Sequence, residues 1–150
     1  MSKRYTLDEI KQLFWEYRKL KYSRLTDDEF GMFCRALSVL PKEIIDTLNK
    51  DVDFILLSAH DRNAVEQACI IMLDEIPKDK KALIILTPIV FEFIGRPTRE
   101  IDMIRAVLHE VAHFHLQNLP YESQEDFEDK ETKTDELVQK WLNDWSEKET

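Results

Sequence analysis

The pentapeptide His109-Glu110-Val111-Ala112-His113 places the strictest requirement on how this 150-residue chain folds. It lies in a strongly helical stretch, and residues four apart on a helix share one face. Both imidazoles can then bind one metal ion from adjacent turns. Glu110 lies about 100° further round the helix, where it can reach a water molecule beside that ion. The pattern therefore predicts a metal site that needs a third ligand from elsewhere in the fold.

Zinc suits such a site, because catalytic zinc takes nitrogen and oxygen ligands, usually three from the protein, and keeps one position open. Glu131 and Asp135 are one turn apart on a predicted C-terminal helix. We predict that Glu131 is the third ligand and that Asp135 accepts a hydrogen bond from a ligating histidine, which fixes its tautomer. The neighbouring carboxylates stay open as alternative ligands: Glu125, Asp126, Glu128, Asp129 and Glu136.

The N-terminal third of the chain predicts helices. Capping boxes begin at Thr6 and at Thr26, each followed by apolar residues at helical spacing. The first apolar series runs to Leu20, and the second helix carries Phe30, Phe33, Cys34, Leu37 and Leu40. Pro41 fits the first turn of a short third helix. We expect these helices to cover the core.

The middle of the chain predicts a small mixed sheet of about three strands, over 51–59, 64–73 and 82–86, with a continuation over 89–93. The stretch 64–73 fits either a helix or a strand, and its Ile70-Ile71 pair favours the strand. Thr98 is the expected N-cap of the helix with the pentapeptide, which runs to about Leu116. Its expected buried face comprises Ile101, Ile104, Leu108, Val111 and Ala112. The acidic stretch 121–129 is expected to be a loop before a last helix over 130–145, which carries Leu137, Val138, Trp141, Leu142 and Trp145 on one side.

The length and charge of the chain narrow the classes of function. One domain over 1–150 is expected, because 150 residues are too few for two full cores. A net charge of −9 argues against nucleic acid and anionic membrane surfaces as partners. Cys34 and Cys69 are predicted to be buried free thiols. With no apolar signal segment or spanning run, the sequence predicts a cytoplasmic protein; it does not indicate an oligomeric state.

The pentapeptide followed by Glu131-Thr-Lys-Thr-Asp135 resembles the gluzincin metallopeptidases, and in particular the minimal zincin of the ImmA/IrrE type. The resemblance covers about 82–145. Thr134 stands where alanine is common in that family, and Ala112 stands where glycine is usual. The resemblance implies a zincin-like α+β fold of N-terminal helices, a small sheet, a motif helix and a glutamate-bearing helix.

The resemblance also implies a function, a zinc-dependent metallopeptidase of narrow specificity with a protein or peptide substrate, such as a regulatory protein. His109, His113 and Glu131 would bind zinc, Asp135 would hold a histidine, and Glu110 would be the general base that takes a proton from the zinc-activated water. Tyr121, His115 and His60 are candidates for stabilising the transition state. The substrate would lie along an exposed strand edge, over 82–86 or its continuation.

Two other readings compete with the peptidase. The first is a non-catalytic interaction or regulatory module with a zincin fold, which leaves Glu110 without a purpose. The second is hydrolysis of a small amide, as in peptide deformylase, whose cysteine-bearing motif we do not find here. Metal-dependent cleavage of a peptide would separate the peptidase from the module.

Overall fold

The structure is a computed structural model, and it describes seven stretches of the chain: 4–18, 25–56, 80–86, 92–93, 96–97, 99–117 and 121–149. Helices predominate over strands in these stretches, and the α+β class is confirmed in this coarse form. Within the same stretches, no helix combines the length and the apolar content needed to cross a bilayer.

Both predicted capping boxes are present. Helix α1 (Leu7–Leu13) follows Thr6, whose hydroxyl accepts from the Glu9 amide at 3.2 Å. The expected continuous first helix is wrong beyond that point, because α1 ends at Leu13 and the 3-10 helix η1 (Trp15–Arg18) follows. The end of the apolar series, Leu20, lies outside the described residues.

The second and third helices begin close to the predicted positions. Helix α2 (Asp27–Ser38) has the Thr26 box, and helix α3 (Lys42–Asp51) follows Pro41, which is its N-cap and not a residue of its first turn. Cys34 is a buried free thiol, as predicted. Burial raises the pKa of that thiol to about 12, so it stays protonated at neutral pH. Cys69 lies outside the described residues.

Two short pairs of strands are described. Strands β1 (Val52–Leu56) and β2 (Ala82–Leu86) are parallel, with Val52 opposite Ala82, and β1 begins after Asp51 because α3 includes that residue. Strands β3 (Glu92–Phe93) and β4 (Arg96–Pro97) form an antiparallel pair. The strand expected over 64–73, the end of the one expected over 51–59 and the stretch 89–91 lie outside the described residues.

Helix α5 (Glu100–Leu116) contains the pentapeptide. Its N-cap is Arg99, so the prediction of Thr98 is wrong by one residue. Ile101 is also not in the core: it is 43% exposed, because it lies near the solvent-facing start of the helix. The buried face comprises Met103, Ile104, Val107, Leu108, Val111, Ala112 and His113.

Helix α6 (Gln124–Glu149) begins six residues earlier than predicted. The acidic stretch is helical because the Ser123 hydroxyl accepts from the Asp126 amide at 3.0 Å, which caps the first turn. Asp126 forms an ion pair with Lys130 at 2.9 Å, one turn along the helix. Acidic residues in a first turn also complement the positive end of the helix dipole. The expected loop is therefore limited to the residues before Gln124.

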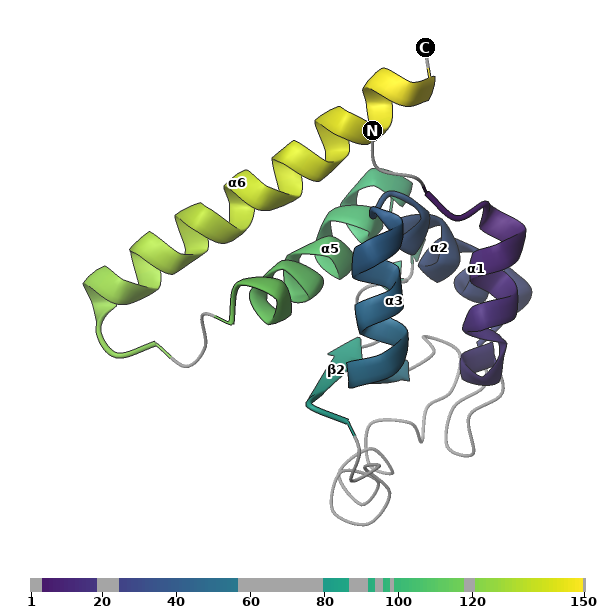
Figure 1. Cartoon of the computed structure of the whole chain (residues 1–150), viewed down its shortest axis with the longest axis horizontal. Coiled ribbons are helices and arrows are strands. Elements are labelled where there is room, and N and C mark those ends of the chain that lie inside the picture. Colours follow the sequence, from purple (N-terminus) through teal and green to yellow (C-terminus); the bar gives the residue numbers. More distant parts are fainter. Residues whose placement is uncertain are drawn as a thin grey trace.

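The core is continuous from the N-terminal helices to α6. Phe14, Phe33 and Phe54 meet edge to face, with ring centroids 5.3–6.2 Å apart, and join the end of α1 to α2 and β1. Helix α5 packs against α2 and against α6, and it also contacts β2. Helix α6 runs back alongside α5 after a turn and extends past it (Figure 1). This pairing of α5 and α6 is what positions the candidate site.

Candidate metal centre

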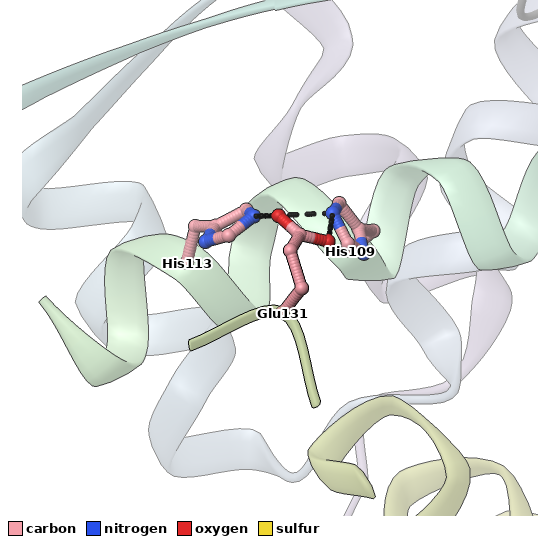
Figure 2. A group of neighbouring side chains, drawn as sticks. All are labelled: His109, His113 and Glu131. Atoms are coloured by element: carbon pink, nitrogen blue, oxygen red, sulfur yellow. Dashed lines mark hydrogen bonds and ion pairs between the residues drawn. The ribbon is translucent and has the colours of Figure 1, made fainter. Parts of the chain in front are cut away.

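His109 and His113 lie on adjacent turns of α5 and turn their Nε2 atoms toward one place, 3.1 Å apart (Figure 2). The His113 ring is buried, and the His109 ring is partly exposed. Val111 and Ala112, between them, face the core and fix the rotation of the helix about its own axis. The two rings lie on the side of α5 that meets α6.

Glu131 of α6 completes a cluster with the two histidines (Figure 2). Its Oε1 lies 3.1 Å from His113 Nε2, and its Oε2 lies 3.3 Å from His109 Nε2. Ligand atoms about 2.05 Å from a tetrahedral zinc ion are about 3.3 Å apart, which is close to the 3.1 Å between the two Nε2 atoms; the two histidines contact different oxygens of Glu131. These three residues could hold a metal ion, although the geometry alone does not identify the metal.

Glu131 reaches the histidines because α6 is anchored on α5 further along. Val138, Trp141 and Leu142 are buried in the shared core, and Leu137 and Trp145 pack against it, as the predicted apolar side of the helix requires. The ring of Trp141 meets His115 of α5, with centroids 6.1 Å apart. This packing sets the register of α6, and Glu131 follows on the same helix.

Three of the five competing carboxylates make other contacts. Asp126 pairs with Lys130, Asp129 pairs with Lys133 at 3.1 Å, and Glu128 accepts from the Gln124 side chain at 3.4 Å. Among the described residues, the only group of three metal-binding side chains this close together is His109, His113 and Glu131, all with ligand atoms within 4.8 Å of one another.

Each imidazole also has a contact at its outer nitrogen. The Nδ1 of His109 lies 3.4 Å from Oδ1 of Asp135, the residue predicted for this role, which is 72% exposed. The Nδ1 of His113 lies 3.4 Å from the hydroxyl of Thr134, which is fully buried. This contact of Thr134 was not predicted, because threonine at that position has no pattern that points to a histidine on another helix.

Tyr121 is the member of the three transition-state candidates that lies at the cluster. Its hydroxyl donates to Glu131 and lies 3.4 Å from His113 Nε2. Burial raises the pKa of Tyr121 to about 12, and the hydrogen bond to Glu131 adds to this, so the phenol stays protonated at neutral pH. The same hydrogen bond lowers the pKa of Glu131, which stays ionised. His115 is exposed and faces Trp141, and His60 lies outside the described residues.

Glu110 faces a different neighbour from the two histidines. It is exposed, and together with His113 it borders a cavity of about 340 Å³ between α5 and β2. Ala82, Leu83 and Ile84 form the β2 side of this cavity. The charge of Glu110 also contributes, after burial and Glu131, to the raised pKa of Tyr121. The cavity thus joins a strand, the glutamate and one histidine.

A second cavity, of about 570 Å³, lies on the His109 side of the cluster. It runs between α5 and α6 and is bordered by Asp135 and Glu136, while Arg105 donates to Gln139 across it at 3.3 Å. The two imidazoles therefore lie between two cavities that are lined by different kinds of side chain. The β2 side is mainly apolar, and the α6 side is lined by charged and amide groups.

The structure thus brings His109, His113, Glu131 and Asp135 into contact and places Glu110 at the edge of the same site. No protein-family model, curated protein or solved structure matches this chain. What the site does must therefore be judged from its own chemistry.

Proposed function

We propose that the protein is a zinc-dependent metallopeptidase with a zincin-like arrangement of its motif helix, strand and glutamate helix. The observation that carries the proposal is the cluster of His109, His113 and Glu131, with ligand atoms within 4.8 Å of one another. A cluster serving structure alone needs no glutamate beside it. Glu110, exposed on the cavity next to His113, supplies what a hydrolytic site requires.

Zinc is the metal we favour, because two imidazoles and one carboxylate are the ligands of many hydrolytic zinc sites. Three protein ligands leave a fourth position for water or substrate. When bound, zinc supplies Lewis-acid chemistry: it makes water acidic near neutral pH and polarises a peptide carbonyl.

The protein's own groups carry the proton transfers. The Glu110 carboxylate accepts the proton of the attacking water and passes it to the nitrogen of the leaving amine. The amine therefore leaves as a neutral group and not as an anion. The Tyr121 hydroxyl is protonated at neutral pH and donates to Glu131 in the structure; on leaving Glu131 it would donate instead to the oxygen that gains charge during the attack. We prefer Tyr121 over His115 for this role because its hydroxyl already lies against two of the ligands.

The substrate we propose is an extended segment of a protein, lying along β2. Main-chain groups of a strand recognise an extended peptide by hydrogen bonds. The cavity beside Ala82, Leu83 and Ile84 is mainly apolar, and its volume of about 340 Å³ has room for apolar side chains of the substrate. We expect narrow specificity for one exposed loop of a partner protein.

The test is metal content and peptide cleavage, measured on the wild type and His109→Ala in parallel. We expect about one zinc per wild-type chain, little in the variant, and zinc-dependent cleavage of a quenched fluorescent peptide library by the wild type alone. A wild type that takes up no zinc at neutral pH would overturn the proposal. Tight zinc binding without cleavage of any library member would instead favour the non-catalytic module.

A further inference from the structure

The cluster of His109, His113 and Glu131 lies between two cavities whose borders carry different charges. We propose that the substrate is cut at a bond with an apolar residue on one side and a lysine or arginine on the other. The apolar side chain lies in the cavity beside β2, and the basic side chain lies in the cavity between α5 and α6. This inference names a substrate class and rests on the proposed peptidase function.

The cavity between α5 and α6 begins at the cluster, because His109 borders it. Asp135 also borders it, with Oδ1 3.4 Å from His109 Nδ1. One turn further from the cluster along each helix, Arg105 donates to Gln139 at 3.3 Å and bridges the cavity. A side chain that enters from a bond held at the cluster therefore meets the carboxylate of Asp135 before the guanidinium of Arg105.

Carboxylates outnumber cations around this cavity. Asp135 and Glu136 both border it, and Arg105 is the only lysine or arginine among the described residues that do so. In the part of the chain that the structure describes, Glu136 forms no ion pair that would offset its charge. A lysine or arginine of the substrate complements this border, whereas an acidic side chain is repelled. The net charge of −9 on the whole chain acts in the same direction.

The cavity beside β2 does not offer the same match. Its carboxylate is Glu110, the proposed base, and Lys81 also borders it, with its ammonium 3.6 Å from Asp51. A second cation would be repelled by Lys81, whereas an apolar side chain can pack on Ala82 and Ile84. Because the cluster lies between the two cavities, the two side chains come from residues on opposite sides of the scissile bond.

The first test is the sequence of the cleavage sites, read by mass spectrometry after the zinc-loaded wild type has digested a peptide library prepared from a whole proteome. We expect lysine or arginine to be enriched on one side of the cut and apolar residues on the other. Cleavage without enrichment of basic residues, or with enrichment of acidic ones, would overturn the inference and leave the peptidase function standing.

The second test is charge reversal at Glu136, which is neither a proposed ligand nor the base. Peptides with a central leucine–lysine or lysine–leucine pair are compared with counterparts that have glutamate in place of lysine. Glu136→Lys should reduce the preference for lysine, measured as a ratio of kcat/KM values, about 3- to 10-fold and mainly through KM. It should retain the zinc content of the wild type.

Glu128→Lys is the matched control for this reversal. It makes the same change of charge two turns away on α6, about 12 Å along the axis, and Glu128 borders neither cavity. At physiological ionic strength a charge that far away is largely screened, so the preference for lysine should be unchanged. An equal preference in Glu136→Lys and Glu128→Lys would overturn the inference.

Peptide binding separates this inference from the proposed function. If the zinc-loaded wild type cleaved no peptide, fluorescence anisotropy with labelled forms of the same peptides would still test the cavity. Tighter binding of the lysine peptides, lost in Glu136→Lys and kept in Glu128→Lys, would support the cavity while the peptidase function failed. Equal binding of the lysine and glutamate peptides would overturn the inference.

Discussion

At the scale of single residues, the proposed metal ligands and the proposed base face different neighbours. His109, His113 and Glu131 form the cluster, whereas Glu110 of the same helix turns toward β2. On a helix, adjacent residues are about 100° apart, so a metal ligand and a base can be neighbours in sequence without competing for one position. This division makes the two roles open to separate tests.

Replacing Glu110 by glutamine keeps the size of the side chain and removes its basicity. We expect Glu110→Gln to retain zinc close to the wild-type content and to lose peptide cleavage about 10²- to 10⁴-fold, the usual contribution of a general base. Elemental analysis and cleavage rates on one preparation would check this. Wild-type rates in the variant would rule out Glu110 as the base.

Glu131→Ala removes the carboxylate of the cluster. We expect zinc affinity to fall by more than the roughly 10- to 100-fold that is typical of losing an outer partner. Glu128→Ala is the matched control, since Glu128 lies on the same helix and contacts Gln124 rather than the histidines. If competition titration showed the larger loss in Glu128→Ala, the third ligand would have to be reassigned.

The approach of His109 and His113 to each other could be predicted from the sequence, because residues four apart on a helix share one face. Glu131 and Asp135 could be proposed because they are also one turn apart, although five neighbouring carboxylates stayed open as alternative ligands. The contact of Thr134 could not be predicted. It depends on how α6 is rotated against α5, and the packing of Trp141 and Leu142 fixes that rotation.

At the scale of elements, helix starts with capping boxes were predicted correctly and the acidic helix start was not. Thr6 and Thr26 each have a glutamate three residues later, which is a strong local signal. Ser123 precedes Asp126 by the same spacing, but the surrounding negative charge suggested a solvated loop. The ion pairs Asp126–Lys130 and Asp129–Lys133, both within α6, offset the repulsion between its acidic side chains.

Removing a cap should cost more where the helix start is buried. Thr26→Ala is expected to lower the free energy of unfolding by about 1 kcal/mol or somewhat more, since the Glu29 of its box is only 4% exposed. Thr6→Ala, in an exposed box of the same design, should cost less. Urea denaturation of both variants gives the comparison. A larger loss in Thr6→Ala would contradict this account of α2.

At the scale of the whole molecule, the cluster lies between two helices that also share apolar packing and the hydrogen bond from Arg105 to Gln139. His109 and His113 come from α5 and Glu131 comes from α6, so a bound ion would link α5 to α6. The unfolded chain has no preformed site, and metal binding therefore stabilises the fold. The stability of the protein should depend on metal concentration.

Zinc at about 100 times its Kd should add about 2.7 kcal/mol to the free energy of unfolding. For a domain of this size that corresponds to a rise of about 5–10 °C in Tm. Thermal denaturation with added zinc, and again after a chelator, measures the shift, and His109→Ala should show little of it. A wild-type Tm that changes neither with added zinc nor with the chelator would mean that no ion links α5 to α6.

The continuity of α6 limits how its sequence can change over time. Glu131, Thr134 and Asp135 lie on one uninterrupted helix with their anchors Trp141 and Leu142. A residue inserted or deleted between Asp135 and Trp141 would rotate the first group by about 100° relative to the second and move it about 1.5 Å along the axis. Substitutions at solvent-facing positions of this segment should leave the geometry of the cluster unchanged, whereas a change in its length should disrupt it. The spacing is therefore what related chains must share.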